Sequence, residues 1–331
     1  MSKVGKNFSF LIPVITFAVL VVFMAGCERQ EKAKLEENKA LIRRSYEEVW
    51  HQGNLDIIDE IFVADFISHE PAGEIRGVEG LKQFATMFLA AFPDVQITTE
   101  DQIAEGDKVV TRWTITGTHK GEFMGIPPTG VKATWTGISI GRAADDKAVE
   151  VWFNWDNLGM LQQLGVIPAE EREDFKWGEP SEVTGDPGDQ EENKALVHRL
   201  GEEFWNQWKL DVIDEIFDTD YILHDPVEGE VRGPEGFKQY AYMFRTAFPD
   251  VKFTIEDIIA EGDKVAARWT GSGTHKGDLM GIPPTGVQGT LKGMDFFRIA
   301  GGKISELWAN SDDLGVLQQL GVIPPMGQGE E

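Results

Sequence analysis

The sequence has one cysteine, Cys27, in 331 residues, so no intramolecular disulfide is possible and packing alone must stabilise its domains. Cations are also scarce, because 31 Lys and Arg stand against 56 Asp and Glu and give a net charge of −25. Such a surface repels phosphate backbones, which rules against nucleic acid as a partner. The six histidines show no spacing such as His-x-x-x-His, so we predict no metal site.

The length suits about two folded domains, and the 41% hydrophobic and 26% charged residues are ordinary for globular proteins. The two halves repeat each other. Glu37-Asn38-Lys39-Ala40 recurs as Glu192-Asn193-Lys194-Ala195, and the stretch from Ile103 to Val131 agrees with its second copy at 23 of 29 positions. A period this long indicates a duplicated domain rather than a solenoid unit.

The N-terminal segment carries Lys3 and Lys6 and then an apolar run from Phe8 to Ala25. This pattern predicts a signal peptide over residues 1–26. The small residues before Cys27 resemble the lipobox of bacterial lipoproteins, so we expect an exported protein that is anchored at the cell envelope through a lipid on Cys27. The alternative is an uncleaved membrane anchor, since the run approaches the ~20 residues that a membrane span needs.

The remaining chain divides by composition and by the repeat. We predict a tether, a first domain, an acidic turn-rich linker, a second domain and a short tail, over residues 27–35, 36–168, 169–190, 191–325 and 326–331.

Each domain is predicted to be α+β, with three helices followed by four antiparallel strands. In the first copy, apolar residues at helical spacing predict a helix over 36–52, a short helix over 55–62, and a third from Gly77 to the Phe92-Pro93 pair. From Val95 onward the pattern alternates between β-branched or aromatic residues and polar ones, with turns between the runs, as in a β-meander.

Strand alternation assigns side chains to faces. Trp113 and His119 share the face that turns toward the helices, and Arg112 lies on the opposite, polar face. In the last strand one face is identical in both copies and the other has changed. The identical set is Glu150, Trp152, Asn154 and Asp156 with Glu306, Trp308, Asn310 and Asp312; the changed set is Val149, Val151, Phe153 and Trp155 against Ser305, Leu307, Ala309 and Ser311.

Several segments occur in the same order in both copies: Phe-Pro-Asp, Ala-Glu-Gly-Asp, Arg-Trp-Thr, Gly-Thr-His, Pro-Pro-Thr-Gly and Leu-Gln-Gln-Leu-Gly. With these segments each half resembles the SnoaL-like polyketide cyclase (ester cyclase) family of the NTF2-like superfamily. The resemblance implies a cone-shaped domain in which a curved sheet wraps the helices around an apolar pocket. The same fold hosts enzymes and binding proteins, so function has to be argued from the site.

In family enzymes a pocket aspartate acts as general acid and base in an aldol ring closure without metal or cofactor. The resemblance places this residue at Asp295, with His275 at the end of the adjacent strand, whereas the first copy has Ser139 and is expected to be inactive. The alternative is that Asp295 is only a polar residue in a strand. The expected pocket residues are His69, Trp113, His119, Trp152, Asp156, His224, Trp269, Trp308 and Asp312. For the tryptophans a packed core is favoured over a ligand cage, and each histidine fits a structural hydrogen bond equally.

Three functions stay open. The first is acid–base catalysis, of cyclase or isomerase type, on a small hydrophobic carbonyl compound. The second is a module that holds such a molecule at the envelope without catalysis. The third is an association module, as a pseudo-dimer within the chain or a homodimer, with Arg112 and Arg268 at the seam.

Overall fold

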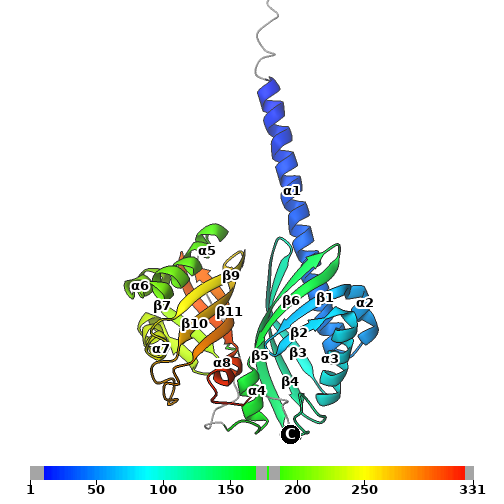
Figure 1. The fold of residues 1–331 in the computed structure, drawn as a ribbon. Helices are drawn as coiled ribbons and strands as arrows, with labels where there is room; N and C mark the ends of the chain where they lie inside the picture. The colour runs from blue at the N-terminus through cyan, green and yellow to red at the C-terminus, as the bar shows by residue number, and fades with distance from the viewer. Residues whose placement is uncertain (1–10, 169–176, 179–186, 325–331) are drawn as a thin grey trace, which may run out of the picture.

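The computed structural model describes residues 11–168, 177–178 and 187–324, which form two domains of one architecture (Figure 1). Helix α1 (Leu11–Arg44) runs from the predicted signal segment into the first domain and continues as a π-helical turn, Ser45–His51. Lys3, Lys6 and the side chain of Cys27 lie outside the described residues. Within the described ranges, we find no helix with both the length and the apolarity needed to cross a bilayer.

The first domain is a six-stranded mixed sheet in the order β2-β1-β6-β5-β4-β3, in which only the β1 and β6 pair is parallel. Its further elements are η2 (Leu55–Ile57), α2 (Ile58–Ile61), β1 (Phe62–Glu70), β2 (Gly73–Arg76), α3 (Gly77–Ala91), β3 (Gln96–Glu105), β4 (Lys108–Thr118), β5 (Lys132–Ala144), β6 (Lys147–Trp155) and α4 (Asn157–Gln163).

The second domain repeats this order, with the sheet β8-β7-β12-β11-β10-β9. Its elements are α5 (Gln190–Arg199), η3 (Leu200–Asn206), α6 (Asp211–Ile216), β7 (Phe217–Asp225), β8 (Gly229–Arg232), α7 (Gly233–Ala247), β9 (Lys252–Glu261), β10 (Lys264–Thr274), β11 (Gln288–Ala300), β12 (Lys303–Ser311) and α8 (Asp313–Gln319).

The α+β class is as expected from the sequence, but each sheet has six strands rather than four, and one strand pair makes it mixed. The additional strands β1 and β2 follow the short second helix directly. A register shift between Phe62 and Ile67 breaks the regular alternation of β1, which explains why its period-2 pattern is weak in the sequence.

The outer face of each sheet, away from its own helices, meets the other domain. The apolar contact between them includes Ile138 of β5 and Met294 of β11, together with Trp177, which falls within the predicted linker and is buried. Ion pairs frame this contact in equivalent positions of the two copies: Lys39 with Glu261, Lys194 with Glu105, Lys264 with Asp101 and Lys108 with Asp257. The two domains therefore contact each other through equivalent positions of their sheets and first helices.

Candidate functional site

The second domain encloses a cavity of about 630 Å³ between the inner face of its sheet and its helices. This volume is within the range of small-molecule sites. Most of its wall is apolar and aromatic, with Trp205, Phe237, Tyr240, Phe244, Phe248, Phe253, Trp269, Leu291 and Leu307 among the lining residues.

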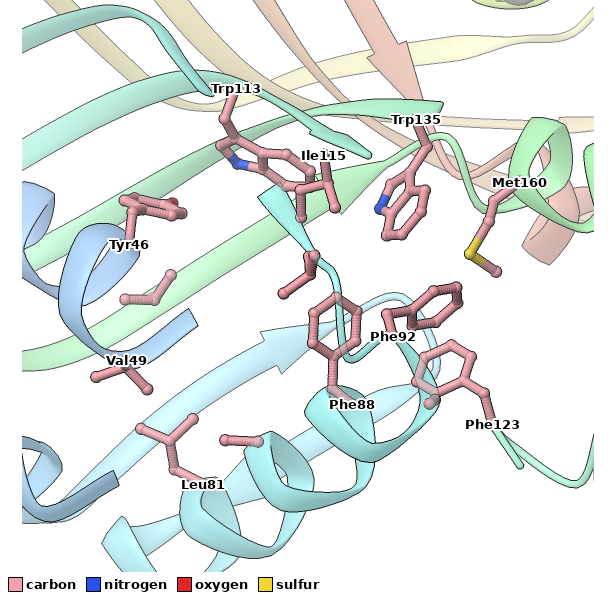
Figure 2. Packing of buried hydrophobic residues seen from close by; sticks show 14 of the residues in the cluster. Tyr46, Val49, Leu81, Phe88, Phe92, Trp113, Ile115, Phe123, Trp135 and Met160 are labelled. Atoms are coloured by element: carbon pink, nitrogen blue, oxygen red, sulfur yellow. The ribbon is translucent and has the colours of Figure 1, made fainter. Parts of the chain in front are cut away.

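The first domain fills the equivalent space, where a void of only about 20 Å³ remains. Figure 2 shows Tyr46, Trp113 and Trp135 packed inside this domain with Phe88 of α3 and with Phe92 just after this helix. Five positions explain the difference, because each is larger in the first copy: Tyr46 against Gly201, Ile115 against Gly271, Trp135 against Leu291, Phe153 against Ala309, and Trp155 against Ser311. Removing side-chain volume without collapse of the surroundings leaves a cavity.

Asp295 lies on β11 between Ala267 of β10 and Ala309 of β12, and its side chain lines the cavity. Burial, reinforced by the charge of Asp225, raises the pKa of Asp295 to about 7. The Trp269 indole partly offsets this shift, although the two side chains do not meet hydrogen-bond geometry. In the first domain the equivalent Ser139 is hydrogen-bonded to the Tyr46 hydroxyl instead.

Two further aspartates line the same cavity. Asp225 ends β7 and accepts hydrogen bonds from the Tyr240 hydroxyl at 3.1 Å and from the backbone N–H groups of Val227 and Glu228 at 2.8 and 2.9 Å. Asp313 begins α8 and accepts from the Ser311 hydroxyl at 3.0 Å. Burial and the neighbouring charge of Asp225 raise the pKa of Asp313 well above its usual range.

This arrangement restricts the chemistry of a ligand. A carboxyl group with a pKa near 7 is suited to both accept and donate a proton at neutral pH. Among the described residues, no Lys, Arg or His side chain lines the cavity. An anionic ligand would therefore meet acids with no compensating cation, so the cavity favours a neutral hydrophobic molecule.

A model of the SnoaL-like polyketide cyclase family matches residues 40–164 and again residues 195–320. The chain belongs to this family. It is 33% identical to aklanonic acid methyl ester cyclase DnrD of Streptomyces peucetius over 138 residues, which are 40% of this chain and 94% of that protein. It is 30% identical to nogalonic acid methyl ester cyclase of Streptomyces nogalater over 38% of this chain and 95% of that protein.

Solved structures of single-domain size also match. IdmH of Streptomyces antibioticus is 36% identical, with 39% of this chain and 99% of that chain covered and a TM-score of 0.35.

Two of the residues predicted for the site, Asp295 and Trp269, line the cavity of this SnoaL-like protein. Trp113, the first-copy counterpart of Trp269, packs in the filled core, where a side chain at Gly137 would collide with its ring. Glycine at this position therefore lets the indole lie flat across the sheet.

His275 is buried beside the cavity wall rather than in it. Its Nδ1 accepts from the Thr285 N–H at 3.3 Å, and its ring packs on Phe248, which lines the cavity. The strand register separates His275 from Asp295, because Asp295 pairs with Ala267, eight residues earlier on the strand. At ~3.3 Å per residue this is roughly 26 Å, so the two side chains do not form a direct proton-transfer pair. His119 makes the equivalent contacts with Thr129 and Phe92 in the first domain.

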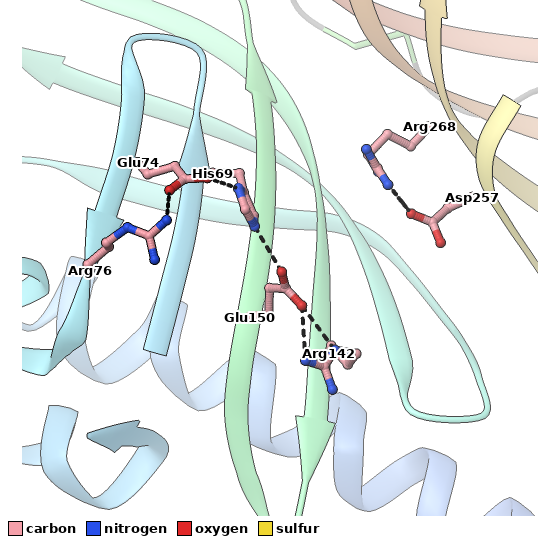
Figure 3. Close-up of polar contacts among 7 residues, drawn as sticks. All are labelled: His69, Glu74, Arg76, Arg142, Glu150, Asp257 and Arg268. Carbon is pink, nitrogen blue, oxygen red and sulfur yellow. Dashed lines mark hydrogen bonds and ion pairs between the residues drawn. The ribbon is translucent and has the colours of Figure 1, made fainter. Parts of the chain in front are cut away.

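Four other predicted pocket residues lie on the outer faces of the sheets. Leu223 and Asp225 line the cavity, so His224 between them points the other way, where it bonds Glu306 and stacks on Trp308. His69 and Trp152 repeat this stack in the first domain. Figure 3 shows His69 between Glu74 and Glu150, with the Glu150 carboxylate also bonded to Arg142.

Asp156 and Asp312 cap helices instead of lining the cavity. Asp156 accepts a hydrogen bond from the Gly159 N–H at 2.7 Å at the start of α4, and Asp312 accepts from the Gly315 N–H at 3.0 Å at the start of α8. Aspartate is favoured at such positions because its carboxylate satisfies free N–H groups of the first turn.

The sequence reasoning missed Asp225, Asp313 and Tyr240. Asp225 follows the predicted residue His224, and strand alternation turns Asp225 rather than His224 toward the cavity. Asp313 follows the predicted residue Asp312, which caps α8, and it is Asp313 that lines the cavity. Comparison of the two copies could have identified these residues. The cavity side of the last strand is the face that changed between copies, and the first copy has Asn157 and Phe84 in place of Asp313 and Tyr240.

Asp295 is expected to make stability depend on pH. Its carboxyl group stays protonated up to about pH 7 in the folded protein but ionises near pH 4 in the unfolded chain. Its contribution to the free energy of unfolding is therefore complete below about pH 4 and is lost as the pH rises through 7. Asp295→Asn, which cannot ionise, should raise the melting temperature relative to the unaltered protein by roughly 5 °C at pH 8 and by much less at pH 4. Calorimetry at both values measures this. The exposed Asp220→Asn is the control, and an equal effect at both pH values would contradict the prediction.

Proposed function

We propose that the second domain binds a small, neutral, hydrophobic carbonyl compound and cyclises it by cofactor-independent acid–base catalysis at Asp295. The observation that carries this proposal is the coincidence of two features in one copy. The copy with an open cavity has a buried carboxyl group, Asp295, in the cavity wall on β11, whereas the filled copy has Ser139 at the equivalent position. The methyl ester substrates named for the Streptomyces relatives are of this neutral carbonyl class.

The proposed step is an intramolecular aldol closure. The ionised Asp295 carboxylate removes a proton from a carbon next to one carbonyl group. The resulting enolate carbon attacks a second carbonyl carbon, so one C–C bond forms and one C=O π bond breaks. The alkoxide then takes the proton back from the Asp295 carboxylic acid, and the product is an isomer of the substrate. The apolar wall excludes water that would otherwise compete for the proton.

The location of this activity is a separate part of the proposal. Ala25-Gly26 before Cys27 supports cleavage ahead of Cys27 and acylation of its thiol, which would hold both domains at the cell envelope. Metabolic labelling with a palmitate analogue should mark the protein, and Cys27→Ala should remove the label. Equal labelling of both forms would contradict the anchor.

The activity is tested by incubating the purified protein with aklanonic acid methyl ester and related neutral polyketide esters. An isomer of unchanged mass with a different retention time and absorption spectrum is the expected result. If a bound ester is recovered unchanged in every case, the cavity is a binding site without catalysis, which is the alternative function that its 630 Å³ volume would also serve.

A further inference from the structure

One wall of the cavity in the second domain is built by the first domain. Leu158 and Gln162 of α4, with Pro168 just beyond it, line the cavity although they precede the second domain in the chain. The equivalent residues of the second copy have no such role, since Leu314 of α8, the counterpart of Leu158, packs in the filled core of the first domain. Helices α4 and α8 thus each contact the other domain, but only α4 lines an open cavity in the domain that it contacts.

Gln162 is the polar member of this wall. Its neighbour Gln163 is fully used by the fold, since its amide exchanges hydrogen bonds of 2.8 and 2.7 Å with the Thr134 backbone. The counterpart in the second copy, Gln318, donates to the Pro324 carbonyl. Across residues 11–168, 177–178 and 187–324, the side chain of Gln162 makes no such bond, and it lines the cavity of the other domain. An amide in this position is free to donate to a carbonyl or hydroxyl oxygen of a ligand.

The first domain also holds the start of α8. Asn157 is buried, and its Nδ2 donates to Oδ1 of Asp312 at 3.1 Å. The same oxygen caps α8 through the Gly315 N–H, and the next residue, Asp313, lines the cavity. Asn157 occupies the position equivalent to Asp313, so an aspartate there would have placed another carboxylate beside Asp312. The amide removes that repulsion and fixes the helix that carries Asp313.

We infer that the first domain is the cavity-completing partner of the second, and that Gln162 is a specificity-determining residue contributed across the domain contact. This rests on the proposed function of the cavity. The first domain has no open cavity of its own and instead supplies part of the wall of the second. A single SnoaL-like domain has no such wall unless a second copy lies beside it. Selectivity for the oxygen-bearing part of the ligand then depends on α4 as well as on the second domain.

The test measures binding of the neutral fluorescent probe N-phenyl-1-naphthylamine to the whole protein. Gln162→Phe should weaken probe binding at least tenfold by occupying the cavity. Gln162→Leu, of similar volume, should tighten it about threefold, because it removes amide N–H groups for which the probe has no oxygen acceptor. The matched variants Gln318→Phe and Gln318→Leu change the equivalent residue of the second copy, which does not line the cavity, and should change the affinity by less than twofold.

The outcomes separate the two proposals. If the unaltered protein binds the probe but the Gln162 and Gln318 variants behave alike, the role of the first domain is overturned and the cavity proposal stands. If the unaltered protein binds no probe, the cavity is not open to ligands, and the proposed function falls together with this inference. Gln162→Leu preserves helix propensity, so its result holds even where the bulkier variant fails to fold.

Discussion

Replacing Asp295 with asparagine is expected to lower turnover of a neutral polyketide ester by about a thousandfold while leaving its affinity within about threefold. General acid–base groups contribute about 10² to 10⁴ in rate, and this carboxyl is the only titratable group of the β11 inner face in the described part of the domain. The amide is close to the same size, so the cavity keeps its shape. Single-turnover kinetics together with a binding titration separates the loss of chemistry from a loss of binding.

Two comparisons sharpen this experiment. Ser139→Ala alters the equivalent position of the filled domain and should leave turnover unchanged. The rate of the unaltered protein should rise as the pH approaches 7, because Asp295 then gains the ionised form that removes the proton. Full activity of Asp295→Asn would eliminate the acid–base mechanism, and a parallel loss of binding would show that the carboxyl group serves recognition.

Replacing Arg112 with glutamate is expected to lower the free energy of unfolding by about 4 kcal/mol. Arg112 is 1% exposed at the centre of the domain contact, where its guanidinium lies over the rings of Trp308, Trp177 and Phe296 at 4.4, 5.4 and 5.9 Å. Burial lowers its pKa to about 10, so the group remains charged at neutral pH. A carboxylate would lose the contacts with the ring faces and would meet the acids nearby, including Asp101 and Glu306.

Urea unfolding measures this effect. Arg112→Met keeps much of the volume without a charge to bury and should cost no more than about 1 kcal/mol. Arg76→Gln removes an exposed arginine that pairs with Glu74 and should change stability by less than about 1 kcal/mol. If Arg112→Glu unfolds at the same urea concentration as Arg76→Gln, the domain contact is not formed in solution. The equivalent Arg268 also lies over a ring, that of Trp152, but it is paired with Asp257 as well (Figure 3). In the described part of the chain we find no such ion pair for Arg112.

The repeat and the strand periods of the fold were readable from the sequence because they depend on local patterns. Helix α3 is predicted by the helical spacing of its apolar residues between Gly77 and Pro93. Strands β3 to β6 are predicted by the alternation of apolar and polar residues. Strand β1 was missed because its register shift interrupts the period. Its parallel pairing with β6 joins segments about 80 residues apart, and no local pattern carries that information.

The site was predicted only in part for the same reason. Alternation gives two faces for a strand but does not say which one is inside, and the identical face of the last strand was assigned to the pocket. The identical face holds Trp152 and Trp308, which pack at or against the domain contact, where a change in one copy must suit the other domain. The changed face of the last strand points inward, where its large side chains fill the first domain and its small side chains leave the second domain open.

The sequence by itself determined that this protein consists of two α+β copies, that Asp295 is a carboxyl group where the first copy has a hydroxyl, and that no disulfide holds either domain. These follow from residue identity and short-range periodicity, which do not depend on distant partners. Only the tertiary structure decided which copy is hollow and that α4 of one domain closes the cavity of the other. Both depend on how side-chain volumes from strands and helices far apart in the chain sum within one shared space.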